Sequence, residues 1–317
     1  MTPTDLAVVL CTYNRAERLD VALHSLEQVR QPKGLNWVLI IVDNNSTDDT
    51  SRVIRRAVAR SILPIHAMFM PEQGKTHALN HGVTYAQDIE AQSIAFTDDD
   101  LTFSREWVAE LWHAFDEPEV MGIRGAIRSS WPTSVRMPSW YADNQQNLHS
   151  VLPRSDLGDT RQRITSPPWG GNMAYRRSVF DEIEMFNHAL GPIGSTHRLG
   201  EDIEFGNRVL AKGLRIDYVP SAVAFHPVYP EQVTKRYFLH WYYEFGKYYV
   251  RVHGLVGHGH FILGVPRHYI REMGKNLLRW MFSWGSQRFY YKLESTEMWG
   301  RIVEAYRTRS APKRRKP

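Results

Sequence analysis

The sequence has 317 residues, 43% of them hydrophobic and 23% charged, which is enough chain for one large domain with a sizeable core. Its single cysteine, Cys11, excludes an internal disulfide and fits a reducing compartment. The net charge of +5 is unevenly distributed, because residues 235–317 hold 17 Lys or Arg against 5 Asp or Glu, whereas residues 1–234 hold 22 against 29. This basic C-terminal part predicts an anionic partner, either membrane lipid or nucleic acid.

The first hundred or so residues alternate between short apolar runs and segments with helical spacing of apolar residues. We expect strands at residues 6–11, 38–42, 65–69 and 93–97. We expect helices after Asn14, which can cap the first one, after Ser46 and Thr47, and at residues 75–85 and 106–115. Strands alternating with helices of this length predict an α/β fold, with a mostly parallel sheet flanked by helices on both faces.

After about Gly125 this alternation stops. Residues 129–168 are rich in Ser, Pro, Asn, Asp and Arg and have no clear periodicity, which indicates long loops. Long loops in a compact domain are usually functional. Helix and strand patterns resume at residues 203–211, 215–219 and 222–225.

The C-terminal part differs in composition from the rest of the chain. From Val233 the sequence contains helical runs dense in aromatic, Lys and Arg residues. We therefore place a boundary near Pro230, which gives a catalytic domain at 1–230 and a helical extension at 231–317 whose tail, from Pro312, is disordered. The aromatic residues of the first run, Tyr237 to Tyr249, either pack against the catalytic domain or lie on anionic lipid.

The sequence also bears on location. The N-terminal residues lack the basic region of a signal peptide. No apolar stretch is long enough to cross a bilayer. We therefore expect a cytoplasmic protein that is at most attached to a membrane surface.

Polar residues follow three of the expected strands, where α/β sheets bind ligands. The most informative are Asp98, Asp99 and Asp100. Adjacent carboxylates raise one another's pKa unless a cation lies between them. Oxygen ligands suit Mg²⁺ or Mn²⁺, which often bridge to substrate phosphates. A solvated turn is the alternative, but the strand before and the apolar helix after the aspartates favour a metal site.

Four further positions have both a functional and a structural interpretation. Asp43 can bind a base or ribose group, or stabilise a turn. Lys75, at a helix start after Gly74, favours phosphate, although no P-loop glycines precede it. Asp202 can act as a general base, or stabilise the N-terminus of a helix. His226 can bind a metal, or be structural.

Taken together, these motifs resemble the inverting family 2 glycosyltransferases, which have a GT-A nucleotide-sugar-binding fold. The resemblance covers about Leu6 to Pro227 and rests on the order and spacing of seven motifs. These are Thr12-Tyr13-Asn14-Arg15, Val42 to Asp48, Gly74 to Asn80, Phe96 to Asp100, Gly170-Gly171-Asn172-Met173, Gly200-Glu201-Asp202 and His226.

The resemblance implies a role for each matching residue. The donor nucleotide would be bound by Thr12, Tyr13, Arg15, Asp43, Lys75 and Asp98. The metal ion, Mg²⁺ or Mn²⁺, would be held by Asp100, Asp98 and His226. The donor sugar and the acceptor would lie against Trp169, Gly170, Gly171, Asn172 and Glu201, although Trp169 can equally be a packing residue. Asp202 would be the catalytic base.

The implied reaction is the transfer of a sugar, with inversion, from a nucleoside diphosphate sugar to an acceptor hydroxyl. A UDP-sugar is the favoured donor, and the acceptor is a lipid-linked sugar or a growing surface polysaccharide. Two alternatives remain open. A nucleotidyltransferase would carry a Gly-rich basic loop after the first strand, where Thr12 to Arg15 stand instead. A basic nucleic-acid-binding protein fits the C-terminal charge, but the body is acidic and has no nucleic-acid motif, so we expect no nucleic-acid partner.

Overall fold

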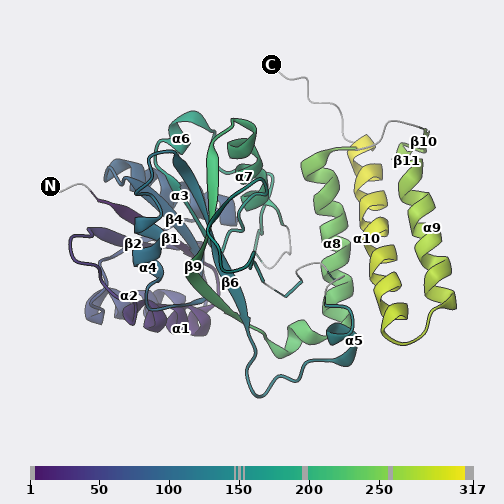
Figure 1. Cartoon of the computed structure of the whole chain (residues 1–317), viewed down its shortest axis with the longest axis horizontal. Helices are drawn as coiled ribbons and strands as arrows, with labels where there is room; N and C mark the ends of the chain where they lie inside the picture. The colour runs from purple at the N-terminus through teal and green to yellow at the C-terminus, as the bar shows by residue number, and fades with distance from the viewer. Residues whose placement is uncertain are drawn as a thin grey trace. The chain divides into compact units, whose positions relative to one another are not determined.

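The computed structural model describes residues 4–310, apart from 146–147, 149–150, 153, 195–198 and 256–259 (Figure 1). The chain forms two compact units. The first contains residues 1–130, 153–196 and 200–227, and the second contains 131–152, 197–199 and 228–317. The sequence predicts a single boundary, near Pro230. In the structure, residues 131–152 also belong to the unit that contains the C-terminal helices. The tail from Pro312 lies outside the described residues.

The first unit is built on one mixed sheet with the strand order β3-β2-β1-β4-β8-β6-β9-β5, in which β7 also pairs with β9. Its parallel part consists of the four expected strands, β1 (Leu6–Thr12), β2 (Trp37–Asp43), β3 (Ile65–Phe69) and β4 (Ser93–Asp98). The buried side chains of β1 alternate between two cores, because neighbouring strand residues point to opposite faces. This confirms an α/β fold with a covered sheet.

Helices cover both faces of this sheet (Figure 1). The helices whose apolar residues pack on one face are α1 (Ala16–Glu27), α2 (Thr50–Arg60) and α4 (Trp107–His113). The helices that pack on the other face are α3 (Lys75–Asp88), α6 (Val179–Glu182) and α7 (Glu201–Ala211). The four expected helices of the first hundred or so residues are all present, with ends that differ by a few residues.

The remaining strands were harder to predict. They are β5 (Thr102–Phe103), β6 (Val120–Ser130), β7 (Gln162–Ile164), β8 (Asn172–Arg176) and β9 (Arg215–Pro227). The sequence suggested two separate segments where β9 is one strand. Pro220 interrupts the apolar pattern there, and the pairing of β9 with β6 shifts in register at that point. A β-bulge of this kind bends a strand without ending it.

The second unit is helical. It contains α5 (Ser139–Ala142), the 3₁₀ turn Pro230–Val233, α8 (Lys235–His253), α9 (Arg267–Phe282) and α10 (Gly285–Ser310), with a small hairpin of β10 (Phe261–Ile262) and β11 (Val265–Pro266). In the part of the chain that the structure describes, no helix is both long enough and apolar enough to cross a membrane.

The aromatic residues of α8 form the core of this second unit. Phe238 and Tyr242 are fully buried and pack with Phe289 of α10 and Trp140 of α5. None of the Phe, Trp and Tyr residues of α8 between 237 and 249 is exposed. Of the two interpretations of this run, the structure therefore supports packing, although the packing partners belong to the second unit. A lipid-facing surface on this unit must be made by other residues.

Candidate active site

Three of the predicted motifs begin side by side at one edge of the sheet. β1 lies between β2 and β4, and all three strands are parallel. Thr12 at the end of β1 pairs with Asp43, and Cys11 pairs with Asp98. Tyr13, the next residue, is half-buried. The loops after these strands therefore start together at the carboxyl edge, where α/β sheets bind ligands.

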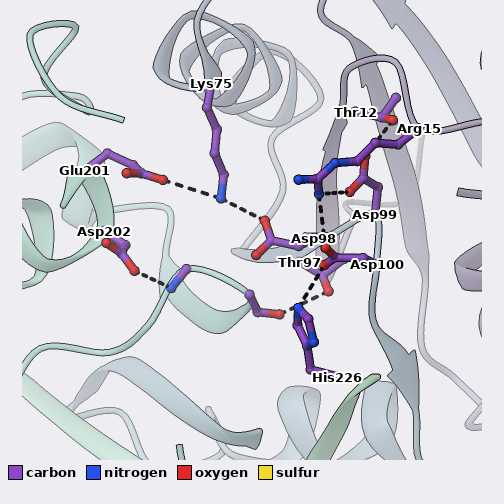
Figure 2. A network of polar contacts seen from close by, with 12 residues as sticks. Thr12, Arg15, Lys75, Thr97, Asp98, Asp99, Asp100, Glu201, Asp202 and His226 are labelled. Carbon is purple, nitrogen blue, oxygen red and sulfur yellow. Dashed lines mark hydrogen bonds and ion pairs between the residues drawn. The ribbon is translucent and has the colours of Figure 1, made fainter. Parts of the chain in front are cut away.

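Asp99 joins two of these loops. Its carboxylate accepts a hydrogen bond from the Thr12 hydroxyl at 2.7 Å and another from the Arg15 guanidinium at 2.9 Å (Figure 2). Burial raises the pKa of Asp99 to about 6, although Arg15 opposes the shift. The sequence pattern predicts no separate role for Asp99. The structure shows that it holds the loop after β1 against the loop after β4.

The loops after β1 and β2 are linked as well. The Asn14 side-chain oxygen accepts the backbone N–H of Thr47 at 2.7 Å, and the Asn14 backbone N–H donates to Ser46 Oγ at 3.0 Å. The expectation that Asn14 caps the first helix is therefore wrong, because its φ of 50° directs it to the neighbouring loop instead. Asp43 is buried and accepts the backbone N–H of Ser46 at 2.9 Å, which is a turn-stabilising contact.

Asp100 lies among three basic side chains. Its carboxylate is 3.0 Å from Arg15 Nη1, 3.8 Å from Arg18 Nη1 and 3.5 Å from His226 Nε2. Burial opposes its ionisation, but the hydrogen bond and charge of His226, together with both arginines, hold the pKa of Asp100 well below its usual range. Asp100 is therefore a carboxylate at neutral pH, which is the form that binds a metal.

His226 is held by a backbone carbonyl and faces Asp100 (Figure 2). Its Nδ1 is 2.7 Å from the carbonyl oxygen of Pro227, and a carbonyl can only accept, so Nδ1 carries a proton. An attractive contact of Nε2 with Asp100 then needs a second proton or a cation between them. Burial lowers the pKa of His226, but the hydrogen bond and charge of Asp100 raise it overall. A histidine oriented in this way fits a divalent metal.

Asp100 and His226 could supply only part of a metal's coordination shell. Among the described residues, no three His, Cys, Asp or Glu side chains are arranged to hold a metal by themselves. Mg²⁺ commonly keeps several waters and takes further oxygens from substrate phosphates. Asp100 and His226, with Asp98 beside them (Figure 2), therefore fit a site that a nucleotide donor would complete.

Lys75 connects the aspartates to the start of α7. Its Nζ is 2.8 Å from Asp98 Oδ1 and 3.4 Å from Glu201 Oε1 (Figure 2). Burial opposes the charge on Lys75, but Asp98 and Glu201 raise its pKa well above the usual value. Burial raises the pKa of Glu201 to about 7, against the effect of Lys75. The ammonium group is thus paired with two carboxylates, within reach of any anion that approaches Asp98.

The side chains of Asp98 and Asp202 both lie against the short backbone segment Gly170-Gly171. The Gly170 N–H donates to Asp202 Oδ2 at 2.7 Å, and Asp202 Oδ1 accepts the backbone N–H of Ile203 at 2.8 Å. A Cβ at Gly171 would lie 3.0 Å from Asp98 Oδ2, so a larger residue there would crowd this carboxylate. Burial also raises the pKa of Asp202, which makes it a stronger base.

Two other predicted residues have different surroundings. Asn172 is fully buried, and its side chain accepts from Trp107 Nε1 and donates to the carbonyls of Ala126 and Ala222. These contacts hold β8 to its neighbours and use the hydrogen-bonding groups of the Asn172 side chain within the protein. Trp169 is half-buried, and the Arg124 guanidinium lies 5.3 Å from its ring centroid. That contact, together with its place against the core, supports packing for Trp169.

The sequence is similar to those of several known proteins. The "Succinoglycan biosynthesis protein ExoM" of Rhizobium meliloti is 25% identical over 226 residues, which cover 69% of this chain and 65% of that protein. The chain thus spans just under two thirds of that relative. The "4,4'-diaponeurosporenoate glycosyltransferase" of Staphylococcus aureus is 32% identical over 122 residues, covering 38% of this chain and 30% of that protein.

A solved structure shows the same fold over most of the chain. It is a mannosyltransferase from Pyrobaculum calidifontis in complex with GDP-Man and Mn²⁺. The TM-score is 0.55 at 17% identity, and the match covers 97% of this chain and 73% of that one. Residues 7–184, more than half of the chain, match the family model for glycosyl transferase family 2. This match favours the glycosyltransferase interpretation over the nucleotidyltransferase one. The chain therefore belongs to glycosyl transferase family 2 and has the GT-A fold.

Proposed function

We propose that this glycosyltransferase is a metal-dependent enzyme that transfers a sugar, with inversion, from a nucleoside diphosphate sugar to an acceptor hydroxyl. The observation that supports this most strongly is the arrangement around Gly170 and Gly171. Asp202 contacts one end of this segment, and Asp98 lies against the other. A base and a nucleotide-binding carboxylate thus lie against the same short segment and can both act on one bound sugar.

The donor nucleotide would lie over the loops after β1 and β2. Arg15 is partly exposed while it holds Asp99 and Asp100, so one side of its guanidinium can meet a phosphate. Thr12, Tyr13 and Asp43 surround the same edge and would contact the nucleobase and ribose. Lys75 and Asp98 would meet the ribose and phosphates next to them. We propose uracil as the base, which makes the donor a UDP-sugar, with guanine as the rival to test.

Asp100 and His226 would hold a Mg²⁺ or Mn²⁺ ion, with Asp98 nearby. When bound, such an ion stabilises the negative charge that develops on the nucleoside diphosphate leaving group. The protein's own part is to present one ionised carboxylate and one imidazole whose orientation is fixed by Pro227. Arg15 and Arg18 limit the repulsion between the neighbouring aspartates until the ion and the donor arrive.

Asp202 would take the proton from the acceptor hydroxyl as that oxygen attacks the anomeric carbon. The attack comes from the face opposite the leaving group, so a single displacement inverts the configuration. The contacts from the N–H groups of Gly170 and Ile203 fix the carboxylate, and burial increases its basicity. Glu201 precedes it and would bind the donor sugar or the acceptor beside Lys75, whose Nζ lies 3.4 Å from Glu201 Oε1.

We propose further that the acceptor is a lipid-linked sugar or a growing polysaccharide and that the enzyme works on the cytoplasmic face of a membrane. Support comes from the basic composition of residues 235–317. It also comes from the names of two relatives, one of succinoglycan biosynthesis and one that glycosylates diaponeurosporenoate.

A thermal-shift screen tests the donor proposal. UDP and GDP are each added with and without Mn²⁺, and a ligand that binds the folded state raises the melting temperature by mass action. We expect one of the two nucleotides to stabilise the protein, and to do so more strongly with Mn²⁺. If neither nucleotide shifts the melting temperature at millimolar concentration in the presence of Mn²⁺, the proposed donor class is wrong.

A further inference from the structure

The C-terminal end of α9 exposes a cluster of large apolar side chains. Phe282 is 79% exposed and Trp284, in the turn that follows, is 84% exposed. Leu277, Leu278 and Met281 are exposed beside them. We call these five residues the α9 tip. Single exposed apolar residues are ordinary on protein surfaces, but five within eight positions form a contiguous apolar surface that marks an interaction site.

The preceding turns of α9 are basic. Arg267, Arg271 and Lys275 are exposed there, and Arg279 is exposed within the segment of the tip. The one acidic residue between 267 and 284 is Glu272. Arg271 and Lys275 share this single carboxylate, at 3.4 Å and 3.0 Å. The segment therefore has an excess of positive charge immediately next to its apolar end.

The two surfaces face the same way. Residues three and four apart share a face of a helix, so Arg267, Arg271, Lys275, Leu278 and Phe282 form one exposed stripe along α9. The stripe changes from basic to apolar after Lys275. At 1.5 Å of rise per residue, Lys275 and Phe282 are separated by about 10 Å along the axis. This separation is close to the depth, roughly 5–10 Å, to which interfacial helices bury their apolar residues in a bilayer.

We propose that the α9 tip inserts into an anionic lipid bilayer while the cations of α9 bind the lipid headgroups. This inference rests on the membrane location that is part of the proposed function, and it names the surface that binds the membrane. The aromatic residues of α8 cannot be that surface, because they are not exposed. Aromatic and long apolar side chains at the boundary, with Lys and Arg at the headgroup level, are the combination that such an interface stabilises.

Charge favours lipid over a second copy of this chain as the partner. In a twofold symmetric dimer the same surface meets itself, so the tips would bring Arg271, Lys275 and Arg279 of one copy close to the same residues of the other. Like charges placed against each other weaken an interface. An anionic membrane offers the opposite charge together with an apolar interior, and so complements both halves of the stripe.

Vesicle co-sedimentation tests the proposal with the full-length protein. The vesicles contain phosphatidylcholine alone or phosphatidylcholine mixed with phosphatidylglycerol. We expect the wild-type protein to pellet with the anionic vesicles, and the double variant Phe282→Ser/Trp284→Ser to partition at least about tenfold less, because two large apolar side chains no longer enter the bilayer. The variant Arg271→Gln/Lys275→Gln should lose about fivefold per removed cation on anionic vesicles, and nothing on neutral ones.

Matched control variants lie on α2 in the first unit. Val58→Ser/Ile62→Ser removes two exposed apolar side chains, of which Ile62 follows the helix, and Arg55→Gln/Arg60→Gln removes two exposed cations. Both should pellet like the wild type. Because all the substituted residues are exposed, we expect melting temperatures close to that of the wild type for every variant.

The outcomes separate the possible partners. If the wild-type protein stays in the supernatant with anionic vesicles, or if the tip variant pellets as the wild type does, the proposal is wrong. If light scattering shows a wild-type dimer that Phe282→Ser/Trp284→Ser dissociates, and no protein pellets, the partner of the tip is a second copy. Mn²⁺-dependent nucleotide binding is measured on the same preparations without vesicles, so its failure would overturn the proposed function and leave the pelleting result intact.

Discussion

Thr12 and Asp99 are hydrogen-bonded at 2.7 Å, although Thr12 is the last residue of β1 and Asp99 lies in the loop after β4. Both side chains are buried, and Arg15 contacts the other oxygen of the same carboxylate. Asp99 therefore fixes the loop that would bind the nucleotide to the loop that would bind the metal. Its neighbours Asp98 and Asp100 remain available for Lys75 and His226.

This contact predicts a stability effect for Thr12→Val. The substitution keeps the shape of the side chain but leaves one oxygen of a buried carboxylate without its donor. We expect a loss of about 1–3 kcal/mol in the free energy of unfolding. Urea denaturation measures it, with Thr165→Val at an exposed position as the control, for which we expect a change within about 0.5 kcal/mol. Equal values for the two variants would show that Thr12 does not support Asp99.

The burial of Glu201 predicts a pH dependence of stability. Its pKa rises to about 7 in the folded protein because of burial, with Lys75 opposing and the charges of Asp202 and Asp98 adding to the rise. At a pH between the ordinary pKa of a glutamate and about 7, Glu201 therefore keeps its proton in the folded state, whereas it has lost it in the unfolded state. The contribution of Glu201 to stability is full below its ordinary pKa and is lost as the pH rises through about 7.

The variant Glu201→Gln removes this titration. From pH 5 to pH 8 we expect the free energy of unfolding of the wild type to fall relative to that of Glu201→Gln, because only the wild type must release the proton. Urea denaturation at unit steps of pH measures the difference, and Glu119→Gln, at an exposed position, should follow the wild type. If the free energies of unfolding of the wild type and Glu201→Gln change in parallel with pH, the raised pKa of Glu201 is contradicted.

Asp202→Asn tests the proposed base. An amide cannot accept the acceptor's proton, but it can still accept the Gly170 N–H, so we expect donor affinity to be retained. Turnover should fall by roughly two to four orders of magnitude, the usual contribution of a general base. Calorimetry gives the affinity and a transfer assay gives the turnover, with Asp181→Asn as an exposed control. A collapse of donor affinity with normal turnover of the bound donor would make Asp202 a binding residue instead.

The parallel half of the sheet was predictable because each of its strands is a continuous apolar run. Buried strands of a parallel sheet are apolar on both faces, and the runs that gave β1, β2 and β4 therefore stand out from the polar loops after them. The polar residues directly after these strands, such as Asp43 and Asp98, were identified as site candidates because each apolar run ends clearly at them. β6 was not predicted because Gly122, Gly125 and Arg124 interrupt its pattern, and β9 appeared divided because Pro220 lies at its bulge.

Other features depend on contacts between distant residues. Nothing in the triplet of aspartates indicates that the middle one is buried against Thr12, whereas the outer two face Lys75 and His226. The aromatic residues of α8 and the apolar residues of α9 look alike in the sequence. Only the packing within the second unit determines that Phe238 and Tyr242 of α8 are buried, whereas Leu278 and Phe282 of α9 are exposed.

Calorimetric titration of the nucleotide selected by the thermal-shift screen, with and without Mn²⁺, tests the proposed metal site at Asp100 and His226 most directly. The wild type should bind more tightly with Mn²⁺. Asp100→Ala should bind with the same weak affinity under both conditions while it melts as a folded protein, and Asp116→Ala, at an exposed position, should behave as the wild type does. A variant Asp100→Ala that keeps the full Mn²⁺-dependent gain in affinity would contradict the account.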